Sequence, residues 1–402
     1  MACLGEASNL VVAPEPPARY SSLDGLRGIA VGLVFLQHYA AGRVALFGWG
    51  WAGVDIFFVL SGFLITGILY DSKDKPFRYR DFYMRRTLRI FPLYYAIWLV
   101  LLILVPVVQW QWGRQWLLWP AYLGNYARFL FFGVGGDPYR FDRLTVGADV
   151  QQWFGSPMHL YIGHFWSLCV EEQFYLLWPL VVYQIRRRET LIKICLCIIV
   201  AVPLLRWWLT VVVPQPLLDM ELLYRSMPTR VDALLLGGLI ALYLRGPEQL
   251  WLKHRRRWLM LGSLLLLVAL YEFSTRVLHL AFHGSATNWI GVWGFTLIDL
   301  FTASLILEAT HPGGLLKQLL DLPWLQNFGV ISYGFYVYHD LLHDFYAYVG
   351  STFFRPHAYL ATLVVAFVSS WLIAWLSYRL LELPFLKLKN RFAHQAHNAP
   401  AV

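Results

Sequence analysis

Long apolar stretches separated by short polar segments run through almost the whole chain. Runs of the length that crosses a bilayer, about 17 to 25 residues, fall at ten places: 24–46, 50–70, 88–108, 164–185, 191–213, 228–245, 258–280, 288–309, 329–349 and 358–382. One long connection, near 109–163, joins the third run to the fourth. The pattern predicts an all-α, polytopic membrane protein of about ten transmembrane helices.

Composition and charge agree with this prediction and orient it. With 58% hydrophobic and 14% charged residues among 402, the chain is too apolar for a soluble protein of its size. The Lys and Arg residues behind the net charge of +9 concentrate in alternate connections, for example 73–89, 186–188 and 255–257. By the positive-inside rule these connections and both termini face the cytoplasm. The charge therefore reflects topology, and no nucleic-acid partner is expected.

The chain divides into one domain with two short ends. We expect a disordered cytoplasmic N-terminus over 1–19, a transmembrane domain over 20–390 and a loose cytoplasmic tail over 391–402. Residues 1–18 lack the charged start and apolar centre of a signal peptide, so the first span is expected to act as its own insertion signal. In the outer connection, the apolar stretch 116–132 suggests a re-entrant or interfacial helix.

Several ionisable residues lie inside the apolar runs at a similar predicted depth. At 1.5 Å per residue they fall about 20 to 22 Å from the cytoplasmic face; they are His38, Asp55, Glu171, Arg230 and Asp232. Isolated charges at that depth are costly, so we expect these side chains to face one another around a hydrated cavity. His38 would act on a hydroxyl as a base, with Asp55 or Glu171 orienting its ring. The alternative is a purely structural ion network.

His339 lies near the predicted middle of its run. It either lines the same cavity or is a core histidine with satisfied hydrogen bonds. Together with Arg230 and Asp232 it is assigned to substrate binding or to the structural ion layer.

A second polar layer is predicted at the cytoplasmic face. Arg27 precedes His38 by eleven residues, which places the two on nearly the same helix face and about 16 Å apart. Arg86 and Arg89 open the third run at i and i+3. Guanidinium groups at a helix N-terminus favour phosphate, so the three arginines are candidates for binding an anionic cofactor. The alternative is that they reach toward lipid head groups.

No metal centre is expected. His279 with His283, and Cys195 with Cys197, have spacings that a metal ion can use, but the remaining ligands are missing nearby.

Small residues in the first two runs predict close helix packing. Gly25, Gly28 and Gly32 share the first run, where they let a neighbouring backbone approach. Ser61 lacks the strand-to-helix turn that exposes a nucleophilic serine, and it too is interpreted as a packing position.

The motifs at these positions resemble the acyltransferase family 3, bacterial integral-membrane O-acyltransferases, over about 20–390. The segments that carry the resemblance are Leu23–Gly28 with His38, Gly53–Phe63, Arg85–Arg89, Phe165–Tyr175, Thr229–Ala233, the segment ending at His339, and Glu382–Phe385. The resemblance implies transfer of an acyl group, usually acetyl from acetyl-CoA, to a hydroxyl of a cell-surface sugar. It also implies that Arg27, His38, Arg86 and Arg89 matter for activity.

The resemblance further implies a multi-pass protein of the bacterial inner membrane. The expected partners are membrane lipids and a cell-surface polysaccharide, lipid-linked glycan or small glycoside as acceptor, with the oligomeric state left open. Aromatic residues of the outer connection, such as Trp112, Trp116 and Tyr122, are candidates for stacking on sugar rings. Some family members add an extracytoplasmic hydrolase-like domain, and we expect none in this chain.

The hypothesis that joins both layers is an O-acyltransferase without a metal. Acyl-CoA would place its phosphates on Arg27, Arg86 and Arg89, and its thioester would reach His38, which serves as base or as acyl carrier. Asp55 and Glu171 complete the predicted catalytic set. The rival hypothesis is a transporter or flippase that uses the buried layer as a proton relay; a sensor or binding module would leave the arginines unexplained.

Overall fold

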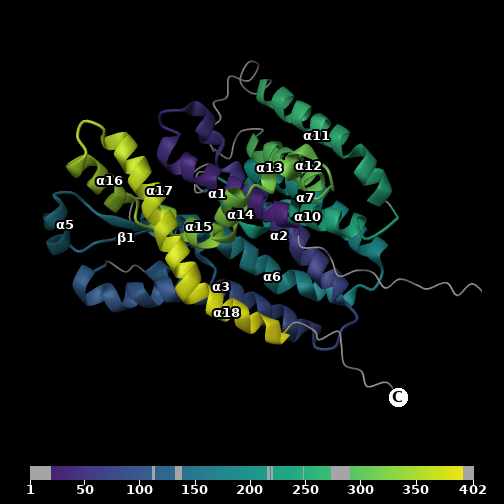
Figure 1. Ribbon diagram of the computed structural model, residues 1–402, viewed down its shortest axis with the longest axis horizontal. Coiled ribbons are helices and arrows are strands. Elements are labelled where there is room, and N and C mark those ends of the chain that lie inside the picture. Colours follow the sequence, from purple (N-terminus) through teal and green to yellow (C-terminus); the bar gives the residue numbers. More distant parts are fainter. Residues whose placement is uncertain are drawn as a thin grey trace, which may run out of the picture.

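The computed structural model describes residues 20–110, 114–131, 138–214, 218, 221–247, 249–272 and 290–392. The predicted disordered segment 1–19 and most of the predicted tail lie outside this part of the chain. Helices dominate the described residues (Figure 1). Five of them are long and apolar enough to cross a membrane, namely Ala45–Asp71, Arg78–Val108, Arg188–Val212, Gly291–Ala309 and Ala358–Leu388. The protein is therefore a multi-pass membrane protein, and the count of ten spans stays a prediction.

The longer helices follow the predicted runs with three differences. Their bounds are α1 (Ser21–Ala40), α2 (Ala52–Asp71), α3 (Arg78–Val108), α6 (Trp166–Gln184), α7 (Arg188–Val212), α10 (Val231–Tyr243), α11 (Gln249–Glu272), α12 (Phe295–Ala309), α14 (Pro323–Val330), α15 (Ser332–Leu341), α16 (His343–Phe353), α17 (Ala358–Ser377) and α18 (Leu383–Leu388). The run 329–349 is broken between α14, α15 and α16, and α11 begins nine residues before the run 258–280. Tyr378–Glu382, between α17 and α18, is a π-helical turn.

Backbone contacts through glycine hold the centre of the bundle. A side chain at Gly62 would collide with the backbone of Leu234, and one at Gly237 with the backbone of Val59, so α2 and α10 cross at contact distance. In the same way Gly25 and Gly28 bring α1 against the segment formed by α13 (Leu315–Leu320) and α14, as predicted. Gly32 makes only an ordinary contact. The central helices are therefore held close together, which fixes the polar residues they carry.

The outer connection is folded in short pieces. The expected helix over 116–132 does not form; the residues there make tight turns at Arg114–Leu118 and Gly124–Tyr126, followed by α4 (Ala127–Leu130). Pro120 and Gly124 interrupt the apolar stretch, and Trp119 is fully buried with its indole N–H donating to the carbonyl of Phe141 (3.1 Å). Packing of large aromatic side chains, rather than helix continuity, orders this part of the connection.

The two strands in the described part of the chain form a small antiparallel hairpin. β1 (Arg143–Thr145) pairs with β2 (His159–Tyr161) in the register Leu144 opposite Leu160. The hairpin and α5 (Ala148–Phe154) lie beside α16 at one end of the molecule (Figure 1).

Tyr122, one of the aromatic residues predicted to stack on sugar rings, packs inside the protein instead. Its ring is buried, stacks on Tyr94 with centroids 4.3 Å apart and faces Phe91 as well. A ring packed on both sides by protein is not open to a sugar. Trp112 lies outside the described residues.

A ring of four charges ties the outer connection to the segment before α10. Arg128 and Arg225 each contact both Asp142 and Glu221, where Glu221 precedes α9 (Leu222–Arg225); Arg225 lies 2.9 Å from Asp142 and Arg128 lies 3.2 Å from Glu221. Burial favours the neutral form of Glu221, but the two guanidinium groups outweigh it and hold the pKa of this carboxyl below its ordinary value. The ring anchors the loop.

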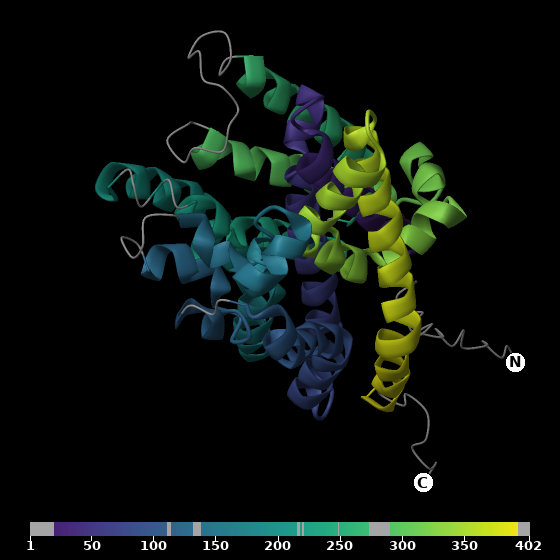
Figure 2. The ribbon, with the colours of Figure 1, turned by 90° about the vertical axis from the view of Figure 1, so that its left-hand side faces the viewer.

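The end of the molecule opposite the hairpin gathers the helix ends that carry basic residues. α17, the π-helical turn and α18 form one long column at the side of the bundle (Figure 2). Its last described residues approach α3 and share the lining of one cavity with Tyr20 at the start of α1.

Candidate active site

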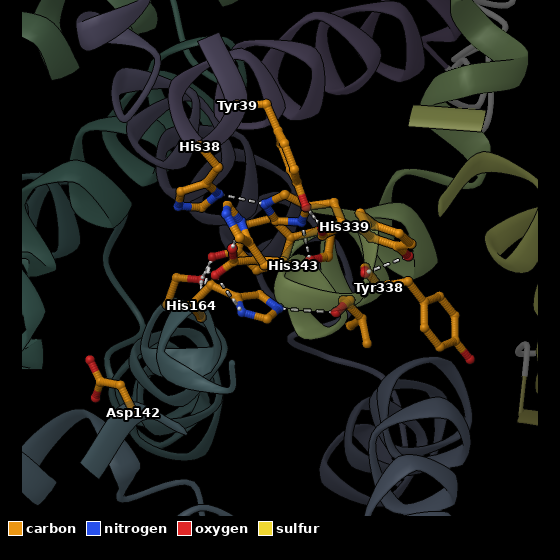
Figure 3. Close-up of polar contacts among 12 residues, drawn as sticks. His38, Tyr39, Asp142, His164, Tyr338, His339 and His343 are labelled. Carbon is orange, nitrogen blue, oxygen red and sulfur yellow. Dashed lines mark hydrogen bonds and ion pairs between the residues drawn. The ribbon is translucent and has the colours of Figure 1, made fainter. Parts of the chain in front are cut away.

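Four histidines from separate elements lie close together where α1 and α15 end (Figure 3). His38 lies in the last turn of α1 and His339 in the last turn of α15; His343 opens α16, and His164 lies in the turn Gly163–Phe165 before α6. The rings of His38 and His339 stack with centroids 4.9 Å apart, and the rings of His164 and His339 are 5.3 Å apart. These four residues are named the histidine cluster. The C-terminal ends of α1 and α15 therefore both lie at the cluster.

Hydrogen bonds assign the tautomers of the two central rings. His339 Nδ1 lies 2.6 Å from the carbonyl oxygen of Tyr336, which can only accept, so Nδ1 carries the hydrogen. The Nε2 atom of neutral His339 is then an acceptor, and it lies 2.8 Å from His38 Nδ1. His38 must therefore donate through Nδ1, which leaves a lone pair on its Nε2 atom. Because His339 is fully buried and His38 is exposed, the basic nitrogen belongs to the accessible ring.

A carboxylate joins the cluster from the same helix as His339. Asp340 Oδ2 lies 3.5 Å from His164 Nδ1, and its Oδ1 lies 3.4 Å from His343 Nδ1. His164 Nε2 donates to the carbonyl of Val337 at 3.0 Å, which fixes that ring from the other side. Tyr39 donates to the carbonyl of His339 at 2.6 Å and stacks on His343. Asp142, at the edge of Figure 3, belongs instead to the charge ring of the outer loop.

A cavity of about 890 Å³ opens on the other side of the cluster. Its wall is built from α1, α2, α3, α6, α15 and the end of α17–α18. Along α2 the lining runs from Val54 to Asp71, so the cavity has two ends. We name the end with Asp71, Lys75, Arg78, Arg245 and Lys389 the mouth, and the end with Phe57, Phe58, Ser167 and Tyr336 the closed end. The volume is in the range of small-molecule sites, about 300 to 1,000 Å³. The predicted phosphate-binding residues Arg27, Arg86 and Arg89 all line this cavity.

The three arginines differ in how closely a carboxylate approaches them. Arg27 lies 3.7 Å from Asp24, at the limit of an ion pair, and the guanidinium of Arg86 covers the ring of Tyr175 at 4.9 Å. Among the described residues, no carboxylate lies within ion-pair distance of Arg86 or Arg89. Guanidinium groups that line an open cavity remain able to bind an anion.

Glu171 lies in this cavity and not beside His38. Its carboxylate accepts a hydrogen bond from Ser61, whose oxygen in turn accepts one from Tyr175 at 2.9 Å. The interpretation of Ser61 as a packing position was therefore incomplete, because Gly62 makes the close approach and Ser61 orients a glutamate. Glu172 and Glu382 line the same wall.

Tyr336 connects the cavity to the histidine cluster. Its hydroxyl donates to the carbonyl of His164 at 2.7 Å and lies 2.7 Å from the hydroxyl of Ser167, which also lines the closed end. Its own carbonyl holds His339. One layer of side chains thus separates the end of the cavity from the cluster.

The remaining members of the predicted layer form a separate network. Asp55 forms an ion pair with Arg230, and both side chains are fully buried. Asp232 pairs with Arg206 at 2.6 Å, also fully buried, and accepts a hydrogen bond from Thr296 at 2.7 Å. The expected contact of Asp55 or Glu171 with His38 is thus wrong, and so is the expectation that all five residues surround one cavity. Equal depth along two helices does not fix which way their side chains point.

Sequence inspection missed two members of the histidine cluster, His164 and His343, and the carboxylate beside them, Asp340. Signals for two of them were available, because Asp340 follows His339 directly and His343 lies four residues after His339. His164 precedes the motif Phe165–Tyr175 and has no helical register with the others. Only the tertiary fold brings it to Asp340.

Within the described ranges, no group of three or more His, Cys, Asp or Glu residues is arranged to hold a metal ion. His279 and His283 lie outside those ranges.

Comparison with known proteins gives consistent relatives. The chain is 27% identical over 377 residues to an O-acetyltransferase OatA of Staphylococcus aureus, which covers 92% of this chain and 58% of the relative. It is 28% identical over 380 residues to a peptidoglycan O-acetyltransferase OatA of Listeria monocytogenes, covering 91% of this chain and 56% of the relative. It is 30% identical over 330 residues to a putative peptidoglycan O-acetyltransferase YrhL of Bacillus subtilis, covering 79% of this chain and 47% of the relative.

The chain spans about half the length of these curated relatives. No solved structure matches it. The family model of acyltransferase family 3, described as an acyltransferase domain, matches residues 20–376. The match includes the histidine cluster and the cavity wall, apart from the part of the wall that follows residue 376 in the column of α17 and α18. The chain therefore belongs to acyltransferase family 3.

Proposed function

We propose that the protein is a membrane-bound O-acetyltransferase that moves an acetyl group from cytoplasmic acetyl-CoA to a hydroxyl of a cell-wall glycan. The observation that carries this proposal is the position of one residue, Tyr336, between a basic cavity and an exposed histidine base. A donor in the cavity and an acceptor at the histidine cluster are thereby separated by a single layer of side chains. Membership of the acyltransferase family supports the reaction class.

The donor binds in the cavity with its charged end toward the mouth. The mouth lies among the basic connections that the positive-inside rule places in the cytoplasm, where acyl-CoA is made. Arg86 and Arg89 bind the diphosphate, with Arg27 beside them, because guanidinium groups pair bidentately with phosphate oxygens. The thin pantetheine arm then extends past Glu171 to Ser167 and Tyr336 at the closed end, and the side chains of this layer move aside to let the thioester reach His38.

The acceptor approaches the exposed face of His38. His38 Nε2 takes the proton of the acceptor hydroxyl as its oxygen bonds to the thioester carbon. The tetrahedral intermediate then collapses, the carbon–sulfur bond breaks, and the departing thiolate takes the proton back from His38. His339 holds the ring of His38 throughout, and it stabilises the imidazolium by accepting its Nδ1–H. His339 is thus a positioning residue, in the place where a carboxylate was expected.

Arg230 has no part in this chemistry. Of its two predicted roles, substrate binding requires an accessible guanidinium, and this one is fully buried against Asp55. With Asp55, Asp232 and Arg206 it is assigned to the structural ion network.

The acceptor proposed is peptidoglycan, because two of the relatives are named for peptidoglycan O-acetylation. A cell-wall glycan lies outside the cytoplasmic membrane, on the side where the positive-inside prediction puts His38 and the hairpin. The localisation proposed is accordingly the cytoplasmic membrane.

The test is turnover by the purified full-length chain in detergent. Acetyl-CoA and soluble peptidoglycan fragments are supplied, and released CoA is followed by a thiol reagent while acetylated fragments are identified by mass spectrometry. CoA release that requires the fragments, together with an equal amount of O-acetylated product, supports the proposal. No turnover with peptidoglycan or other envelope glycans, with acetyl-CoA still bound, would contradict it.

His357→Gln serves as the matched control for changes at His38, because His357 is an exposed histidine at the start of α17, apart from the cluster. An acetyl group trapped on His38 after rapid quenching would replace the base mechanism by one in which His38 carries the acyl group. Both mechanisms use the same residues, so the trapping measurement separates them.

A further inference from the structure

The mouth of the cavity carries a basic cluster that the donor site described above does not use. Lys75 lies in the connection between α2 and α3, Arg78 opens α3, and Lys389 follows α18; all three line the cavity. Lys75 and Arg78 are three residues apart, and Lys389 comes from a segment far from them in the sequence. These three residues are named the mouth cluster.

The mouth cluster is separated from the inner arginines along one helix. Arg78 and Arg89 are eleven residues apart on α3, which corresponds to about 16 Å along its axis, and Arg86 lies between them. Long side chains shorten this gap on both sides. A ligand with two anionic groups, one at the inner arginines and one nearer the mouth, is therefore the ligand that the two sets of charges fit.

The other residues of the mouth limit how its charge is used. Arg245 lines the mouth too, but Asp71 holds it through two hydrogen bonds of 2.6 Å, so its charge is already balanced. Arg78 donates to the carbonyl of Lys73 at 2.5 Å, which orients the guanidinium without neutralising it. Lys75 is exposed and has a long, flexible side chain, as expected for a group that contacts a ligand entering from the cytoplasm.

We propose that the mouth cluster binds the 3′-phosphate of the donor's adenosine, and that the protein thereby selects CoA thioesters over shorter pantetheine donors. The inference rests on the proposed function, since it assumes an acyl-CoA donor whose diphosphate lies at Arg86 and Arg89. In CoA the 3′-phosphate is attached beyond the diphosphate, on the side away from the thioester. With the thioester at the closed end, that phosphate falls toward the mouth.

The experiment compares two ligands that differ only in this phosphate. Binding of CoA and of dephospho-CoA to the purified full-length protein in detergent is measured by calorimetry. For the wild type we expect CoA to bind roughly tenfold or more tightly, as for one or two charge-assisted contacts. In the double variant Lys75→Gln/Lys389→Gln the ratio of the two dissociation constants should fall toward one, through weaker binding of CoA alone.

The matched control is Lys387→Gln, which removes the same charge two residues from Lys389 at an exposed position that does not line the cavity. It should keep the wild-type ratio. Arg78→Gln is expected to lower the ratio as well, and it supplies a second variant if the double variant is poorly folded.

Three outcomes overturn the inference, and they separate it from the proposed function. Equal binding of CoA and dephospho-CoA to the wild type removes the 3′-phosphate site but leaves CoA as donor. A ratio that survives the loss of Lys75 and Lys389 moves the site elsewhere. Binding of neither ligand overturns both the inference and the proposed donor.

Discussion

Two charged regions of the bundle look alike in the sequence and differ in the structure. In the cavity, Arg27, Arg86 and Arg89 line open space without carboxylates in direct contact with the latter two. Among α2, α7, α10 and α12, by contrast, Asp55 pairs with Arg230 and Asp232 with Arg206, and none of these four side chains is exposed. Both regions consist of charges within apolar runs.

The difference shows what makes a buried charge functional. Ion pairs that are closed to solvent satisfy each other, and their removal leaves an uncompensated charge. Charged side chains that face a cavity can instead bind a ligand of opposite charge. An accessible nitrogen with a free lone pair, such as His38 Nε2, can take part in chemistry. Four predictions test this comparison, starting with the largest expected effect.

The exposed base should have the largest effect on activity. In His38→Gln the side chain keeps hydrogen-bonding capacity but cannot take up a proton at neutral pH, so transfer should fall by about 10² to 10⁴-fold. Binding of acetyl-CoA should stay close to wild type, because the inner arginines are untouched. The measurement is CoA release at saturating acetyl-CoA, with His357→Gln as control. More than about a tenth of wild-type transfer would move the base to another residue of the histidine cluster.

The closed ion network should affect stability and leave the site alone. Asp55→Asn removes the carboxylate in direct contact with the buried Arg230, and breaking such a buried pair is expected to cost about 3 to 5 kcal/mol of the free energy of unfolding. Thermal unfolding in detergent with a lipid present measures this loss. The protein that still folds at low temperature should bind acetyl-CoA normally. A variant with wild-type stability and lost donor binding would place Asp55 in the site.

The inner arginines should show the opposite pattern. Arg86→Ala and Arg89→Ala should each weaken binding of acetyl-CoA by about 1.5 to 3 kcal/mol, as for a lost charge-assisted hydrogen bond. Lys at these positions should restore binding only in part, since an ammonium cannot form the bidentate fork. Unfolding temperature should change little, because both side chains face the cavity. Parallel loss of binding and protein level would favour the lipid-anchoring alternative.

The smallest effect is expected in the outer loop, where titration can be followed directly. The folded-state pKa of Glu221 lies below its unfolded value, so its ion pairs contribute stability above the unfolded pKa. This contribution should be lost as the pH falls through the folded pKa. Glu221→Gln should lower the unfolding temperature at neutral pH and make its decrease at acidic pH shallower. An unchanged acid dependence would show that the charge ring does not hold the loop.

The sequence determined the general character of the protein on its own. Apolar runs of spanning length identify a multi-pass membrane protein because lipid requires such runs, and the motifs around Arg27, His38, Arg86 and Arg89 identify the family. Gly25 and Gly28 of α1 were correctly interpreted as contact points, because a missing side chain lets a neighbouring backbone approach. The arginines near the start of α3 were placed in one region by local helical spacing.

Only the tertiary structure decided which polar residues meet. Depth along a helix can be counted from the sequence, but the rotation of each helix about its axis depends on packing with its neighbours. That rotation places Glu171 against Ser61 in the cavity and Asp55 against Arg230 in the closed network. It also gives His38 a second histidine, His339, as partner. The hairpin and the turn carrying His164 are held by contacts between distant segments, so no local sequence pattern predicts them.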